Sequence, residues 1–167
     1  MRLLLAALAA ASSLLPVVHA APREPPAGSA ERKQLADDLR TPMQEQIGKP
    51  ILFRFKHLRL EGDWAYAVWI PLQPNGRPFD WAGTRWAEPF PPEDACTLLR
   101  REGGTWRPVH AVIGPTDATC ECAPYFVELM HDAGEPARAA ARSVPVALFP
   151  NPTCGPVAVP ASRPARR

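Results

Sequence analysis

The sequence predicts an α+β fold in which an N-terminal helix packs on an antiparallel sheet of about four strands. Residues 30–47 carry an apolar stripe with a helical period, and residues 51–72 and 97–113 each have the pattern of a β-hairpin. Strands and helices do not alternate along the chain, which argues against a parallel sheet. We expect the helix to cover one face of the sheet, and a short helix and an extended Pro-rich tail to follow.

The first 20 residues have the composition of an export signal. Arg2 gives a positive start, an apolar run reaches Val18, and small residues precede the expected cleavage point after Ala20, with Ala21 as the alternative. Two serines and a proline interrupt the apolar run, so it is too short and too broken for a membrane span. The cleaved product is expected to be periplasmic or secreted, without a membrane span.

Proline content suggests the boundaries of the folded part. The 22 prolines concentrate around residues 22–26 and from residue 145 onward. We therefore expect a disordered linker over residues 21–29, a single domain over residues 30–150 and a Pro/Arg-rich tail over residues 151–167. The mature chain keeps 18 basic and 17 acidic side chains, since Arg2 is lost from 19 and 17. This balance gives no electrostatic reason to expect a nucleic-acid partner.

All the cysteines lie in the exported portion, and an even count in an oxidising compartment favours disulfide bonds. The four are Cys96, Cys120, Cys122 and Cys154. A bond between Cys120 and Cys122 would close a tight ring, so one or both should pair with Cys96 or Cys154. We prefer an arrangement in which Cys154 attaches the tail to the Cys120/Cys122 segment.

The N-terminal helix has clear boundary residues. Ser29 is a plausible N-cap, and Gly48 a plausible end. Pro42 either kinks this helix or occupies the first position of a second turn capped by Thr41. The stripe that should pack on the sheet consists of Leu35, Leu39, Met43 and Ile47.

Two hairpins supply the strands. In the first, residues 51–60 and 64–72 flank a Gly-containing turn, and a β-bulge near Lys56 and His57 would place the apolar residues of the first arm on one face. In the second, residues 97–102 and 105–113 flank Gly103 and Gly104, and Pro108 argues for an edge position or a locally unpaired site. Between them, residues 78–81 should turn back beside the second arm, and residues 82–94 should form a loop. Residues 124–133 should form the short helix.

Several short motifs together resemble a family of small exported bacterial proteins of unknown function. They are Gly48-Lys-Pro50, Gly62-Asp-Trp-Ala65, Leu98-Leu-Arg-Arg-Glu-Gly-Gly-Thr-Trp106 and Ile113-Gly-Pro-Thr-Asp117. The resemblance covers roughly residues 30–150. The element order is also similar to the cystatin-like and NTF2-like arrangement of a helix on a curved antiparallel sheet. Neither resemblance implies catalytic residues, because a fold does not determine a function.

Motifs for known chemistry are absent from the sequence. There is no Gly-x-Ser-x-Gly nucleophile turn and no Gly-rich phosphate loop. Cys120-x-Cys122 with His110 and His131 offers metal-ligand types, but the spacing is not that of a zinc site, and disulfides are the better interpretation. We therefore expect no metal and no cofactor.

An acid/base enzyme is the alternative hypothesis. It would use a pocket between helix and sheet, with His110 and Asp117 as the acid/base pair and Asp80 and Glu88 nearby. Nothing in the spacing requires these groups to converge, and Asp117 is equally suited to capping a turn.

Surplus tryptophan favours a binding function instead. Trp64 and Trp106 are expected in the core opposite the N-terminal helix, and the remaining aromatic residues are candidates for a ligand or partner surface. We therefore predict a non-catalytic exported domain that binds an unknown protein or cell-envelope ligand. The candidate contact residues are Trp69, Trp81, Trp86, Phe90, His110 and Asp117.

Overall fold

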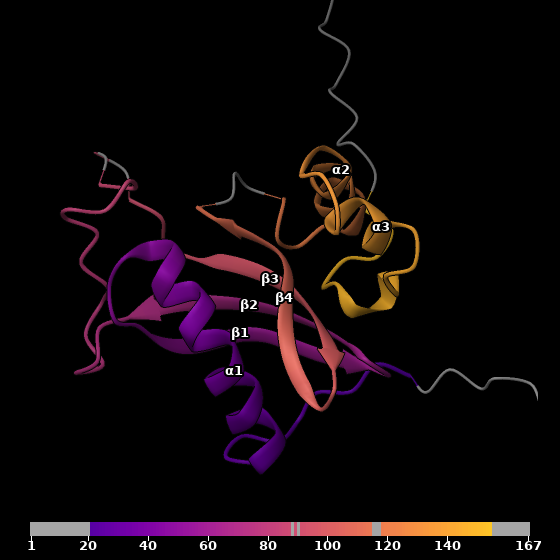
Figure 1. Cartoon of the computed structure of the whole chain (residues 1–167), viewed down its shortest axis with the longest axis horizontal. Helices are drawn as coiled ribbons and strands as arrows, with labels where there is room; N and C mark the ends of the chain where they lie inside the picture. The colour runs from indigo at the N-terminus through magenta and orange to yellow at the C-terminus, as the bar shows by residue number, and fades with distance from the viewer. Residues whose placement is uncertain (1–20, 88, 90, 115–117, 155–167) are drawn as a thin grey trace, which may run out of the picture.

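The computed structural model describes residues 21–87, 89, 91–114 and 118–154 and confirms the α+β class (Figure 1). Its strands form one antiparallel sheet in the order β1-β2-β3-β4. The elements are α1 (Ala30–Ile47), β1 (Leu52–Glu61), β2 (Trp64–Leu72), β3 (Ala95–Glu102), β4 (Thr105–Ile113), α2 (Ala123–Asp132), α3 (Ala137–Ala141) and the 3-10 turn η1 (Val146–Leu148). The expected signal peptide lies outside the described residues.

Helix α1 is continuous through Pro42. The Ser29 hydroxyl accepts a hydrogen bond from the Arg32 backbone N–H at 3.2 Å, and Gly48 ends the helix in the left-handed conformation at φ 83°. The predicted stripe is the buried face, since Leu35 and Leu39 are fully buried and the other two members are nearly so. Burial of this stripe offsets the backbone hydrogen bond that the proline removes.

Both hairpins form as predicted. The register of β1 against β2 shifts between Phe55 and His57, which confirms the expected bulge. Gly103 and Gly104 have φ values of 57° and 86°, as a primed two-residue turn requires. Pro108 lies on β4, an edge strand, and beside a second bulge: Leu98 pairs with His110 and Leu99 with Pro108, so Val109 has no register partner on β3.

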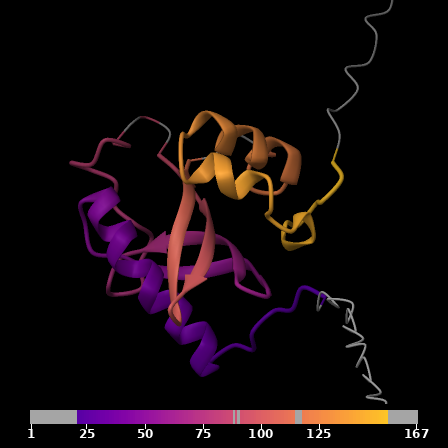
Figure 2. The same ribbon diagram turned by 45° about the vertical axis from the view of Figure 1, so that its right-hand side comes forward.

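Both faces of the sheet are covered, whereas the sequence predicted cover on one face only. Side chains of α1 pack with Ala67 and Trp69 on the first face. On the second face, the rings of Phe126 of α2 and of Phe149, just after η1, pack against Tyr66. Figure 2 shows α1 and the α2–α3 pair on opposite sides of the sheet. The single-face prediction is wrong because residues 120–150 form a compact second layer rather than one isolated helix and a tail.

The two tryptophans that follow the hairpin turns point to opposite faces. Trp106 is 1% exposed and lies in the α1-side core, as predicted, but Trp64 packs in the α2-side core. The register explains the difference: Trp64 pairs with Arg100 and Trp106 pairs with Arg101. Successive residues of β3 face opposite sides, so their cross-strand partners do too.

Residues 21–29 are attached to the sheet, which differs from the disordered linker that their composition predicts. The backbone N–H of Arg23 donates to the carbonyl of Leu60, and the N–H of Leu60 donates back to Arg23, both at 2.9 Å. Pro25 is buried, and its carbonyl accepts from the Arg32 side chain at 3.0 Å. Composition alone does not reveal these contacts, because an edge strand offers unpaired backbone groups to any neighbouring segment.

One disulfide fixes the second layer to the sheet, and another closes a loop within that layer. Cys96 of β3 pairs with Cys120, and Cys122 pairs with Cys154, which agrees with the preference for joining Cys154 to the Cys120/Cys122 segment. Asn151 forms an isolated bridge with Cys122, so the first residues of the expected tail belong to the folded part. Within the described ranges, no helix is long and apolar enough to cross a membrane.

Candidate functional site

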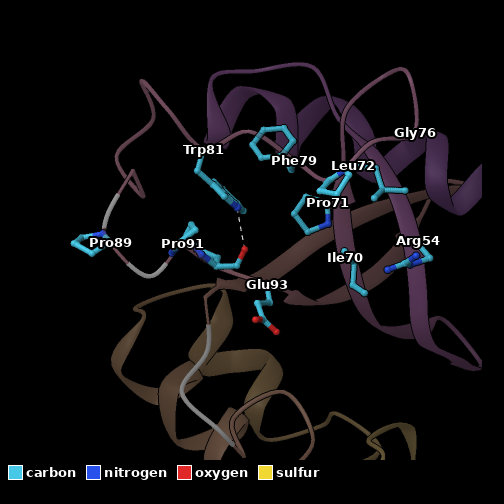
Figure 3. A pocket seen from close by; sticks show the side chains of 12 residues that line it. Arg54, Ile70, Pro71, Leu72, Gly76, Phe79, Trp81, Pro89, Pro91 and Glu93 are labelled. Atoms are coloured by element: carbon cyan, nitrogen blue, oxygen red, sulfur yellow. Dashed lines mark hydrogen bonds between the residues drawn. The ribbon is translucent and has the colours of Figure 1, made fainter.

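A cavity of about 540 Å³ lies where β2 extends beyond β3 (Figure 3). The first residue of β3, Ala95, pairs with Trp69, so residues 70–72 of β2 extend beyond β3 and face the loop of residues 73–94. Leu72 forms an isolated antiparallel bridge with Pro78 of this loop, as expected for a segment that turns back beside the strand. We call this cavity the proline–tryptophan pocket. Its lining consists of Arg54, Ile70, Pro71, Leu72, Gly76, Pro78, Phe79, Trp81, Pro89, Pro91, Pro92 and Glu93.

The floor of the pocket is the uncovered end of the second sheet face. Ile70 and Leu72 alternate with Val68 along β2 and therefore share its face. Val68 belongs to the α2-side core, but Ile70 and Leu72 do not and are only half-buried. Apolar strand residues are thus left partly open at this end of the sheet.

The loop supplies rigid apolar walls. Trp81 is buried, stacks edge-on against Phe79 with ring centroids 4.7 Å apart, and lies 5.8 Å from Trp86 in the same manner. Its indole N–H donates to the carbonyl of Pro92 at 2.9 Å, which is the dashed line in Figure 3. The indole donor is therefore already satisfied within the wall.

Hydrogen-bond donors are scarce in this lining. Five of the twelve lining residues are prolines, which have no backbone N–H. The charged side chains are Arg54 and Glu93, both exposed, at separate positions in Figure 3. Arg54 has no ion-pair partner among the described residues. Such a lining suits an apolar group and offers little to a sugar or another polyol, which needs convergent donors.

Trp69 and Trp81 both belong to the α1-side core and Trp86 packs against it, but of the three only Trp81 lines the pocket. Trp86 contacts Trp81 and carries Arg85 over its own ring at 4.1 Å. Trp69 is 0% exposed, and its indole N–H donates to the buried hydroxyl of Thr97 at 3.0 Å. A ligand surface cannot include a side chain that no solvent reaches. Phe90 lies outside the described residues.

The two described members of the expected acid/base group, His110 and Asp80, do not line the pocket. His110 is on the second sheet face, where its ring packs edge-on against Phe126 at 5.3 Å. Asp80 is exposed and interacts with Lys49 at 3.5 Å, and the N–H of Ala82 lowers the pKa of its carboxyl group. Asp117, the expected partner of His110, and Glu88 lie outside the described residues. An enzyme with this acid/base set therefore receives no support from the pocket.

The sequence could not reveal the pocket floor. Ile70 and Leu72 have the alternation of ordinary core residues, and only the register shows that β3 begins too late to cover them. The prolines of the loop were visible in the sequence, but their convergence on β2 depends on tertiary structure.

Burial of His110 predicts a pH dependence of stability. Its Nε2 atom is buried and has no hydrogen-bond partner in the described part of the chain, and burial lowers the pKa of its imidazole. As the pH falls through the ordinary histidine pKa of about 6.5, the unfolded chain takes up the proton first. The free energy of unfolding should therefore decrease until the lowered folded-state pKa has been passed.

His110→Leu should make that decrease shallower while keeping an apolar contact with Phe126. Urea unfolding of both proteins at several pH values between 8 and 5 measures the effect. His57 contributes a slope of the same sign, because burial also lowers its pKa, so some pH dependence should persist in the variant. Parallel curves for variant and wild type would show that His110 gains no proton on unfolding.

No group of three metal-binding side chains suited to holding an ion occurs in the part of the chain that the structure describes. Comparison with known proteins gives no match to a family model, to a curated protein or to a solved structure. The resemblance to a family of small exported proteins therefore stays a prediction.

Proposed function

We propose that this chain is an exported, non-catalytic domain that binds an apolar part of a protein or of a cell-envelope molecule in the proline–tryptophan pocket. The observation that carries the proposal is the pocket lining: apolar strand residues on the floor, Trp81 and Phe79 on the wall, and five prolines around them. Both disulfides are consistent with an oxidising compartment.

Rigidity of the walls supports a binding role. A proline has one soft backbone dihedral fewer than other residues, so a wall built from prolines loses little entropy when a ligand orders it. The Trp81 ring is held by its hydrogen bond to Pro92 and by edge contacts with two aromatic neighbours. The pocket is thus preorganised, and an apolar ligand would gain burial at a small ordering cost.

The test compares two tryptophan substitutions in the same loop. Pro91 is exposed and lines the pocket, whereas Ala87 is exposed and does not. Immobilised wild type, Pro91→Trp and Ala87→Trp are incubated with detergent-solubilised cell envelope, and the bound components are quantified by mass spectrometry. We expect Pro91→Trp to retain at least about tenfold less of a component that wild type and Ala87→Trp retain in equal amounts, because a filled pocket removes the buried apolar contact.

Urea unfolding of both variants controls for damage to the fold. If all three proteins, equally stable, retain every component to the same extent, the pocket is not the binding site. Near-UV circular dichroism in the presence of the recovered component gives a second readout, because a ligand in the pocket changes the surroundings of Trp81.

A further inference from the structure

The outer edge of β1 is paired with Arg23 at one end, is closed just before its other end by a side chain of α1, and is open between them within the described ranges. At one end Arg23 exchanges two backbone hydrogen bonds with Leu60, and the neighbouring Pro25 and Leu58 are both buried. At the other end the N–H of Ile51 donates to the side-chain carbonyl of Gln44 at 3.3 Å. The protein therefore already uses this edge for strand pairing.

The open part is centred on Phe53 and Phe55. In an antiparallel pair, backbone groups point alternately towards the partner strand and away from it. Those of Leu60 point away from β2, because they bond to Arg23. The bulge after Phe55 shifts the alternation by one residue, so the backbone groups of Phe53 and Phe55 point outward as well. Within the described ranges these groups have no hydrogen-bond partner.

The side chains along this stretch alternate between apolar and cationic. Phe53 and Phe55 are half-buried on the α1 side of the sheet, with ring centroids 6.0 Å apart, and Phe53 packs on Trp69 at 4.9 Å. Arg54 projects on the opposite face, is exposed and has no ion-pair partner among the described residues. The order apolar–cationic–apolar is complementary to a strand of order apolar–acidic–apolar.

We propose that β1 binds an extended peptide segment with an acidic residue between two apolar residues, added as an outer strand along Phe53 to Phe55. The backbone groups of the two phenylalanines supply the hydrogen bonds, their rings take the apolar side chains, and Arg54 pairs with the acid. This surface is separate from the pocket, although Arg54 borders both, and the proposal does not depend on the proposed function.

A second copy of this chain fits the edge less well. A symmetric antiparallel pair of β1 edges centred on the open stretch would place Arg54 opposite Arg54, and directly opposed like charges destabilise a sheet. The unpaired arginine thus disfavours self-association while leaving the edge available to an acidic partner.

The probe is the blocked peptide acetyl-Thr-Val-Glu-Val-Thr-amide, titrated into the disulfide-bonded mature chain. Solvent exchange of backbone amides is followed by NMR. We expect the Phe53 and Phe55 amides to exchange at least about tenfold more slowly when the peptide is bound, because their N–H groups become hydrogen-bonded. No binding at millimolar peptide, or protection at Ala111 and Ile113 of β4 instead, would overturn the proposal.

Matched variants test the charge. Arg54 and Arg59 are both exposed, lie on the same strand and face, and have no ion pair in the described structure, but Arg59 lies beyond the open stretch. Arg54→Glu should weaken binding of the Glu peptide about fivefold and strengthen binding of the analogue with Lys in place of Glu. Arg59→Glu should change neither affinity appreciably. Equal effects of the two substitutions would indicate long-range attraction rather than strand addition.

Two further controls separate this edge from other sites. A peptide N-methylated at both valines keeps its side chains but loses backbone donors, and it should not bind. Pro91→Trp should bind the unmodified peptide as wild type does, since the pocket is not involved. Unchanged binding of the methylated peptide, or loss of binding in Pro91→Trp, would assign the peptide to the pocket. If the Phe53 and Phe55 amides are protected from exchange without peptide, and the protection grows with protein concentration as a dimer forms, the edge serves self-association.

Discussion

Replacing Cys96 and Cys120 together by alanine should lower the free energy of unfolding by about 3–5 kcal/mol, the upper part of the range for disulfides in small domains. The bond closes a sequence separation of 24 residues, and both sulfurs are buried, with Cys96 0% and Cys120 3% exposed. It also fixes the segment before α2 to β3, so its loss loosens the layer that covers the second sheet face. Equilibrium urea unfolding without reductant measures the change.

The second disulfide provides the matched control. Cys122 and Cys154 are 32 residues apart, so the loop-entropy contribution is nearly the same, about 3.5 kcal/mol for either bond. Cys154 is half-exposed, however, and its bond attaches only the last described residues. We expect the double substitution Cys122→Ala and Cys154→Ala to lower the free energy of unfolding by less than the double substitution of Cys96 and Cys120 does. Equal losses would mean that both bonds act through chain entropy alone and that core packing at Cys96 adds nothing.

Local patterns were enough to predict most of the first layer and the sheet. The α1 stripe, the two turns and the bulge beside His57 depend on periodicity and turn chemistry within one hairpin or helix, and each is confirmed. The bulge was predictable because apolar residues on opposite sides of a regular strand cannot both be buried by one helix. Such arguments need only a few neighbouring residues.

Features that depend on the relation between hairpins were not predictable in this way. Trp64 was expected opposite α1 together with Trp106, yet the register of β2 against β3 places it on the other face. The second layer was missed for a related reason. The sequence of β2 shows an apolar face, but it does not show whether a helix or solvent covers that face. The tyrosine at position 66 illustrates this, because its hydroxyl donates to the Cys120 carbonyl 54 residues away.

The candidate site was predicted in part. The prediction placed it on aromatic residues of the loop after β2, and Trp81 does line the pocket. Trp69 was included as one of the surplus tryptophans, and it shares its side of the strand with Ala65 and Ala67. Both alanines are fully buried and give room for α1 to approach closely. Small residues on a strand thus indicated close packing rather than exposure.

Trp69→Ala should therefore destabilise the protein by about 3–5 kcal/mol, as expected for a large aromatic side chain removed from a close-packed core. The ring is fully buried on the α1 side and contacts Phe53 edge-on. Its removal also leaves the hydroxyl of Thr97, which is 0% exposed, without its donor. Urea unfolding monitored by far-UV circular dichroism gives the free energy without relying on the deleted fluorophore.

Trp86→Ala is the matched substitution. This ring is half-buried and contacts Trp81 and Arg85 at the surface of the loop, so its loss should cost at most about 1 kcal/mol. Its effect should appear instead in binding, because the wall of the pocket loses a support of Trp81. A Trp69→Ala protein as stable as wild type but unable to bind would restore Trp69 to the ligand surface. The opposite pattern, a large loss of stability at Trp69 and a loss of binding at Trp86, follows from a core on one side of β2 and a ligand pocket at its end.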